Sequence, residues 1–181
     1  GPRTEVSELV GVPRGDLVLL NDDDLTYAKL RLDPVSLATA VPSVAEIDSS
    51  IARALCWAAA WDMCRDGEMP AREYVAMVLG GAGAEHDISV VDALLGRRVA
   101  VALDEYADPS WRPVGLRLMS DRMRELLDAA EPGSDHQLAW ARGLVWSASQ
   151  PAELEFVRGV LDGTTAVPGL AVDNDLRWRI V

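Results

Sequence analysis

The spacing of hydrophobic side chains predicts a chain that is helical from residue 34 onward, because apolar residues recur there with the period of an amphipathic helix. Pro70 is placed in a first turn, and Ser89, Ser134 and Asp173 are predicted helix caps. Helices joined by short loops pack antiparallel to their neighbours. The expected fold is therefore all-α, an irregular α-α superhelix of HEAT- or armadillo-like helix pairs. The expected helices cover residues 36–45, 50–65, 71–80, 89–106, 113–130, 135–148, 151–162 and 173–181.

Residues 50–65 are apolar on every face, with the uncharged run ALCWAAAW at residues 54–61. Asp48, Ser49 and Ser50 are candidate N-caps, and Gly67 can adopt the positive φ of a helix exit. A helix that is apolar all round normally lies inside a packed array. Eight residues are far short of the roughly 20 that cross a bilayer. We therefore predict the central helix of a mostly helical domain.

Residues 1–33 follow a different pattern and are predicted to form a lead-in and a short β-hairpin. Residues 17–20 are all apolar, and in residues 25–32 successive side chains would point to alternate faces of a strand. The four polar residues 21–24 separate these two runs. An isolated two-stranded hairpin is marginal in water, so these residues are expected to be the tail of a β-sandwich domain whose other strands lie elsewhere. Residues 34–181 would then be a helical C-terminal domain. Its apolar ending at Trp178, Ile180 and Val181 predicts a truncated domain that self-associates through its ends.

Charge and cysteine content narrow the environment of the protein. The net charge of −12 argues against nucleic-acid and anionic-membrane partners, since both require a basic face. Cys56 and Cys64 are eight residues apart on one predicted helix, which separates them by ~12 Å and prevents a disulfide. Two unpaired thiols and the lack of an apolar signal core predict a cytoplasmic location.

No catalytic, cofactor-binding or metal-binding residue is predicted, although several residues carry suitable chemistry. His86 and His136 are fifty residues apart, and no His-Glu-x-x-His zinc motif occurs. Residues 85–87 (EHD) could recruit a metal ion, but a solvated loop is favoured. Cys56 and Cys64 are interpreted as core thiols because their surroundings are apolar.

Two further motifs are also better explained by structure than by ligand binding. Residues 80–83 (GGAG) follow a helix and lack the Lys of a phosphate-binding loop, so they are interpreted as a helix exit. Residues 22–24 (DDD) lack EF-hand spacing and are interpreted as a hairpin tip. The tryptophans could stack on ligands but are interpreted mainly as core or as parts of apolar helix faces. They are Trp57, Trp61, Trp111, Trp140, Trp146 and Trp178.

Several ordered segments resemble the C-terminal region of zinc aminopeptidases of the aminopeptidase N family. Residues 20–33 (LNDDDLTYAKLRLD) look like the junction between the β-sandwich and the helical domain of that family. Residues 52–63 (ARALCWAAAWDM) and 65–70 (RDGEMP) are similar to the helical segment that follows in bacterial members. Residues 106–109, 134–141 and 173–178 (YADP, SDHQLAWA and DNDLRW) continue the resemblance, which covers the chain from about residue 16.

The resemblance implies a non-catalytic, truncated domain of a peptidase that removes N-terminal residues from peptides. Zinc would belong to the parent enzyme, because the family's zinc-binding, substrate and catalytic-Tyr motifs have no matching position here. The partners implied are the catalytic domain of the same polypeptide and, through it, peptide substrates. The domain would cover the active-site chamber and restrict access to it. The alternative is a stand-alone helical-repeat scaffold for protein interactions.

Overall fold

The computed structural model describes residues 4–181 and confirms the all-helical class. No strand occurs within those residues. The described part of the chain contains eight α-helices, and each has a counterpart among the predicted helices. Their bounds are α1 Pro34–Ser43, α2 Ser50–Arg65, α3 Ala71–Gly81, α4 Ile88–Ala93, α5 Arg112–Ala129, α6 Asp135–Ser147, α7 Pro151–Asp162 and α8 Asn174–Ile180.

Shorter helical turns connect or extend these helices. Four are 3₁₀ turns, namely η1 Ser7–Leu9, η2 Asp22–Asp24, η3 Val44–Glu46 and η4 Ala82–Ala84. Two are π-helical, namely η5 Leu94–Val99 and η6 Ala102–Tyr106. The predicted helix at residues 89–106 is thus one continuous helical stretch, which begins as α4 and contains the two π-helical segments η5 and η6. The sequence pattern predicted its length but not its π turns.

Helix beginnings are set by local side-chain caps. The Ser134 hydroxyl accepts a hydrogen bond from the Gln137 amide, and the Asp173 carboxylate accepts one from the Leu176 amide, both as predicted. Ser49 caps α2 in the same way. Two predictions were wrong by one position or more. Asp87 rather than Ser89 caps α4, and Pro70 occupies the N-cap position of α3 rather than its first turn.

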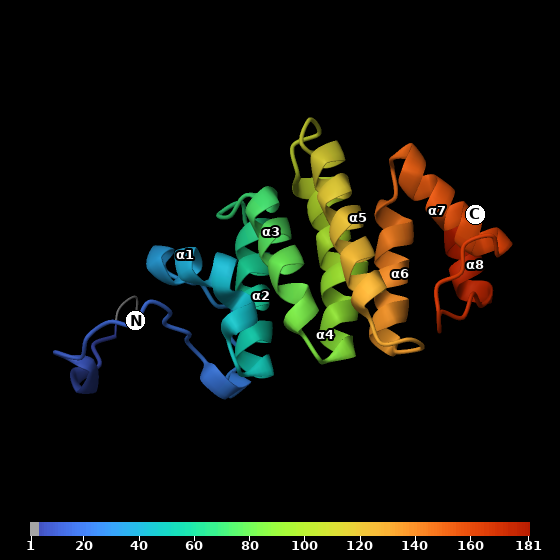
Figure 1. Ribbon diagram of the computed structural model, residues 1–181. Helices are drawn as coiled ribbons and strands as arrows, with labels where there is room; N and C mark the ends of the chain where they lie inside the picture. The colour runs from blue at the N-terminus through green and yellow to red at the C-terminus, as the bar shows by residue number, and fades with distance from the viewer. Residues whose placement is uncertain (1–3) are drawn as a thin grey trace.

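The helices pack in two layers that extend side by side from one end of the molecule to the other (Figure 1). In one layer α3 contacts both α1 and α5, and in the other α6 contacts both α4 and α8. Helix α2 packs on α3. We predicted α2 to be the central helix, but α3 is more central, because it contacts α1, α2 and α5. We call residues 34–181 the helical body.

The core of the helical body forms where the two layers meet. Large side chains that are almost completely buried there include Trp57, Tyr74, Met77, Met119 and Met123. α2 contributes nine buried residues but leaves Ile51 half exposed on its outer side. Burial of this apolar surface is the main favourable contribution to folding. No helix in residues 4–181 is both long and apolar enough to cross a membrane.

The predicted β-hairpin is wrong, because residues 17–32 form an extended segment with a turn instead of paired strands. The Asn21 side-chain amide donates to the Thr26 carbonyl oxygen at 2.7 Å and accepts from the Thr26 amide at 2.7 Å. These are the backbone groups that a strand ladder would require. The flanking side chains of Leu17, Leu19 and Leu30 pack against the helical core instead. We call residues 4–33 the N-terminal arm.

Candidate functional site

The most buried charged group of the described chain is Glu85, in the loop between α3 and α4. Its side chain is 0% exposed and forms an ion pair with Arg53 of α2, which is 6% exposed. The Arg53 Nε atom lies 3.1 Å from Glu85 Oε2, and Nη2 lies 3.3 Å from Oε1. This loop was predicted to be solvated, and that interpretation was wrong for Glu85.

Further hydrogen bonds satisfy the remaining acceptor sites of Glu85. Its Oε1 atom accepts from the amides of His86 and Asp87 at 2.8 and 2.9 Å, and from the Ser50 hydroxyl at 3.1 Å. Burial alone would raise the pKa of Glu85. The Arg53 guanidinium and these donors outweigh that effect and hold the pKa below its ordinary value. Glu85 is therefore a charged anchor for the loop.

Arg53 extends the same anchor to the N-terminal end of α2. Its Nη1 group donates to the carbonyl oxygens of Ile47 and Asp48 at 2.7 and 3.1 Å. A buried ion pair is tolerated when its remaining polar atoms are hydrogen-bonded in this way. The pair connects α2 with the loop that leads into α4. Its geometry is that of a structural connection between these two segments.

The two histidines do not form a shared site. His86 is exposed, whereas the Nε2 atom of His136 lies 3.1 Å from the backbone oxygen of Glu85. The His136 ring also packs beside Trp140, with 5.9 Å between ring centroids. Within residues 4–181 no three His, Cys, Asp or Glu side chains are grouped so that they could hold a metal ion.

The other residues considered for chemistry have structural surroundings. Cys56 and Cys64 are buried and unpaired, as predicted, and burial raises the pKa of Cys56 to about 11. Such a thiol is a poor nucleophile near neutral pH. Gly81 ends α3 against the Trp57 side chain, in agreement with the helix-exit interpretation. Asp22 to Asp24 form η2, beside α2.

The tryptophans divide between core and surface. Trp57 is fully buried and Trp140 is nearly so, while Trp61 and Trp111 are partly buried against the core. Trp146 and Trp178 are exposed, the latter by 80%. The interpretation as core, made for Trp57 and Trp61, agrees with these positions, and Trp178 is uncovered, as its place at the apolar end of the chain predicted.

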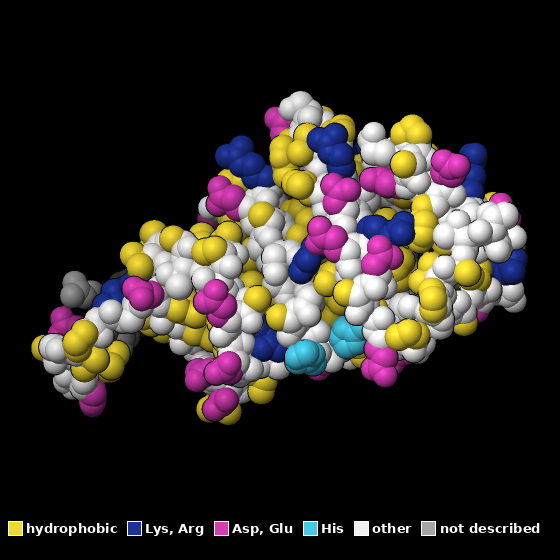
Figure 2. All heavy atoms as spheres, in the orientation of Figure 1, with side chains coloured by type: hydrophobic (Ala, Val, Ile, Leu, Met, Phe, Trp, Pro, Cys, Tyr) yellow, Lys and Arg dark blue, Asp and Glu magenta, His cyan; other side chains and the backbone are white. Residues whose placement is uncertain are grey.

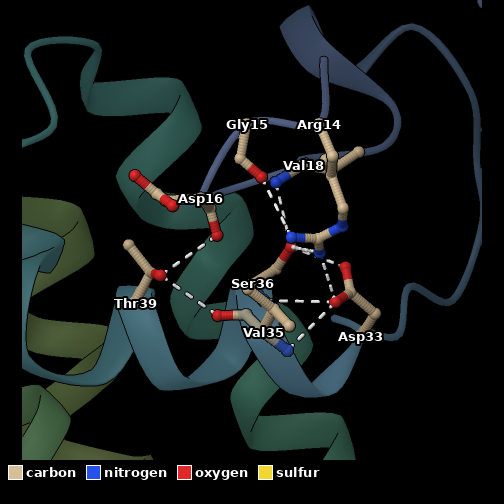
Figure 3. A network of polar contacts seen from close by, with 8 residues as sticks. All are labelled: Arg14, Gly15, Asp16, Val18, Asp33, Val35, Ser36 and Thr39. Carbon is tan, nitrogen blue, oxygen red and sulfur yellow. Dashed lines mark hydrogen bonds and ion pairs between the residues drawn. The ribbon is translucent and has the colours of Figure 1, made fainter. Parts of the chain in front are cut away.

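A polar network attaches the N-terminal arm to the start of α1 (Figure 3). The Asp33 carboxylate caps α1, accepts from the Ser36 hydroxyl at 2.6 Å and forms an ion pair with Arg14. The Ser36 hydroxyl in turn accepts from the Val18 amide at 2.9 Å. The Ser36 hydrogen bond, followed by the other donors, lowers the pKa of Asp33 to about 2.

A second polar contact attaches the arm to the end of α2. Lys29 and Arg31 both form ion pairs with Asp66, and Arg31 also pairs with Glu68 at 2.6 Å. The hydrogen bond from Lys29 makes the largest contribution to lowering the pKa of Asp66. The four side chains are 32–50% exposed, so solvent screens these interactions.

An open groove lies between α2 and α4, and we call it the α2–α4 groove. Its volume is about 450 Å³. Its wall on the α2 side is mainly apolar, and Asp24 and Arg98 supply charge. A concave apolar surface with a few polar groups is typical of binding sites. The lining residues include Ile51, Ala54, Leu55, Trp57, Ala58, Val90 and Ala93.

Comparison with known proteins agrees with the resemblance seen in the sequence. Residues 17–181 match the family model described as "ERAP1-like C-terminal domain". The whole chain is also 49% identical to a protein of Streptomyces lividans named "Aminopeptidase N". The chain spans about a fifth of the length of that relative, at 21%. Since the family model covers more than nine-tenths of the chain, this protein belongs to the ERAP1-like C-terminal domain family.

Proposed function

We propose that this chain is the non-catalytic C-terminal helical domain of a zinc-dependent aminopeptidase that removes N-terminal residues from peptides. The observation that carries the proposal is the 49% identity of the whole chain to one-fifth of an aminopeptidase N. The described residues also contain no grouped metal ligands, so zinc would be held elsewhere in the polypeptide. The same similarity does not favour the stand-alone scaffold.

Within this proposal the helical body covers the active-site chamber of the catalytic domain and restricts which peptides enter. The two-layered succession of helices supports an irregular superhelix of HEAT- or armadillo-like pairs. The α2–α4 groove is our candidate for the surface that faces the chamber, because it combines apolar walls with charged groups at its edge. The parent enzyme would be cytoplasmic, and its catalytic domain would be the partner of this chain.

Variants of the longer enzyme that contains this chain test the chamber role. Ala58→Trp places a bulky side chain in the α2–α4 groove, and Ala76→Trp places one on the exposed surface of α3 as a control. We expect Ala58→Trp to lower kcat/KM for long peptides by about tenfold while leaving small aminoacyl arylamides unchanged. Equal effects of both variants on every substrate length would contradict the chamber role.

The non-catalytic assignment has a separate test. The 181-residue chain is incubated with zinc and an aminoacyl arylamide, and release of the arylamine is followed. We expect no turnover, since the described residues offer neither a zinc site nor a general base beside one. Turnover by the purified, metal-loaded chain would overturn the assignment, whatever the outcome for the groove.

A further inference from the structure

A short turn of the N-terminal arm, at residues 21–24, forms part of the wall of the α2–α4 groove, and we call it the arm turn. Asp24 lines the groove together with Ile51, Ala54 and Ala58 of α2. The 3₁₀ turn η2, which contains Asp24, contacts α2 directly. The groove is therefore bounded by α2, by the stretch α4–η5 and by the arm. A bulky group that enters it lies beside the arm turn.

The backbone of the arm turn has an unfavourable conformation. Asn21, Asp23 and Asp24 have φ angles of 57°, 62° and 53°, which lie in the left-handed region. Within residues 4–181 they are the only residues other than glycine with positive φ. Side chains disfavour this region, because the Cβ atom then approaches the following carbonyl oxygen. Asn and Asp tolerate it best, but three such residues within one turn accumulate strain, and strain of this kind is typical of switch regions.

The Asn21 side chain holds the arm turn in this conformation. Its Nδ2 group donates to the Thr26 carbonyl oxygen at 2.7 Å and to the Asp24 carboxylate at 3.0 Å. Its Oδ1 atom accepts from the Thr26 amide at 2.7 Å. All three hydrogen bonds are exposed, so water competes for the same groups. The turn is therefore strained in its backbone and closed by hydrogen bonds that open easily.

The segments on either side of the arm turn are attached separately to the helical body. Leu17 and Leu19 before the turn, and Leu30 after it, pack against the core. Lys29 also forms an ion pair with Asp66 at 2.6 Å. The turn can therefore open locally while the rest of the arm stays in place.

We propose that the arm turn is a conformational switch that responds to occupation of the α2–α4 groove. In the closed state, which the structure shows, Asp24 lies at the groove. In the open state residues 21–26 leave α2, and the release of the left-handed backbone offsets part of the lost contacts. A bulky group in the groove disfavours only the closed state, so it shifts the equilibrium toward the open one. The inference does not depend on the proposed function.

Hydrogen exchange of the Thr26 amide in the 181-residue chain measures how often the switch opens, because that amide donates to Asn21. Ala58→Trp fills the groove, and Ala76→Trp on the exposed surface of α3 is the control. We expect Ala58→Trp to accelerate the exchange about tenfold and Ala76→Trp to leave it unchanged. Equal exchange rates in the two variants would overturn the proposal. Exchange of Thr26 in the unaltered chain at the rate of an unfolded peptide would also overturn it, since no closed state would then exist.

Two glycine variants in the arm turn test the role of strain. Asp22 and Asp23 are both exposed, but only Asp23 has positive φ. We expect Asp23→Gly to slow the exchange of the Thr26 amide about threefold, because glycine adopts positive φ without strain. Asp22→Gly should accelerate it about twofold, since glycine there only adds freedom to the open state. A change in the same direction in both variants would contradict the proposal. These measurements use the chain alone, so they are separate from the test of the chamber role.

Discussion

The N-terminal arm and the helical body differ in what holds them in place. Within residues 4–181, eight of the sixteen large apolar side chains that are exposed lie in the arm, between Val6 and Tyr27. Figure 2 shows apolar side chains gathered at that end of the molecule. The arm is attached through partly exposed polar contacts such as Asp33–Ser36 and Arg31–Asp66, together with Leu17, Leu19 and Leu30, which pack against the core. The helical body instead encloses a continuous apolar core.

This difference predicts that changes in the helical body alter global stability, whereas changes in the arm alter only its attachment. Exposed ion pairs contribute little because water screens them. Buried side chains contribute much, since a cavity, a clash or an unpaired charge in the core has no solvent to relieve it. The variants below test the comparison, beginning with the largest expected effect.

Arg53→Ala is expected to cause the largest loss of stability. It leaves Glu85 charged and buried without its partner, which costs about 3–5 kcal/mol in the free energy of unfolding. Urea denaturation measures the loss, and Arg65→Ala is the control because the Arg65 side chain is 51% exposed and lies 3.7 Å from its partner Asp62. The double variant Arg53→Met, Glu85→Gln should recover more than half of the loss, because it removes the unpaired charge. A loss below about 1 kcal/mol for Arg53→Ala would contradict the burial argument.

Gly81→Ala is expected to have the next largest effect. A Cβ atom at Gly81 would lie 2.5 Å from Val44 Cγ1 and 2.9 Å from Trp57 Cζ2, both in the core. Overpacking of this kind costs about 1–3 kcal/mol. Gly80→Ala is a matched control in the same helix, since its Cβ would meet no atom within 4 Å. We expect that control to gain about 0.5–1 kcal/mol. Thermal unfolding of the two variants should therefore shift in opposite directions.

The sequence predicts most of the helical body because helix signals are local. Ser134 and Asp173 cap helices that begin directly after them, and the apolar period defines the rest. Glu85 could not be placed in the same way, because Arg53 lies 32 residues away in the chain. The available signal was Arg53 itself. A charged residue within an otherwise apolar helix face requires a buried partner.

The N-terminal arm and the grooves were harder to predict, because they depend on side-chain contacts that the local sequence pattern does not encode. The alternation in residues 25–32 is a strand signal, but Asn21 occupies the Thr26 backbone groups that pairing would need. A further groove, lined by Arg97, Arg142 and Arg179, combines residues from η5, α6 and α8, which no spacing in the sequence brings together. The apolar period of residues 89–106 predicted a helix but not the π turns η5 and η6 within it.

The attachment of the arm is expected to depend on pH through Asp33. The folded-state pKa of about 2 lies below the ordinary 3.8, so the unfolded or detached state binds more protons between these values. The contribution of Asp33 is therefore present above pH 3.8 and is lost as the pH falls toward 2. The NMR shift of the Val18 amide, which donates to Ser36, should titrate with a midpoint near pH 2. Ser36→Ala removes the acceptor of the Val18 amide, so in that variant the Asp33 carboxyl carbon is followed instead, and its pKa should be raised. A native midpoint near 3.8 would contradict the assignment.

Asp66→Asn is expected to have the smallest effect on stability and a specific effect on the arm. It removes the shared partner of Lys29 and Arg31, so the arm should open locally more often. Trypsin cleaves after both of these residues, and we expect cleavage there to accelerate roughly threefold while the melting temperature is unchanged. Asp62→Asn is the control, because Asp62 pairs with Arg65 and not with the arm. If Asp66→Asn lowered the melting temperature as much as Gly81→Ala does, the ion pairs of the arm would be part of the stability of the helical body, and the contrast between the two regions would be wrong.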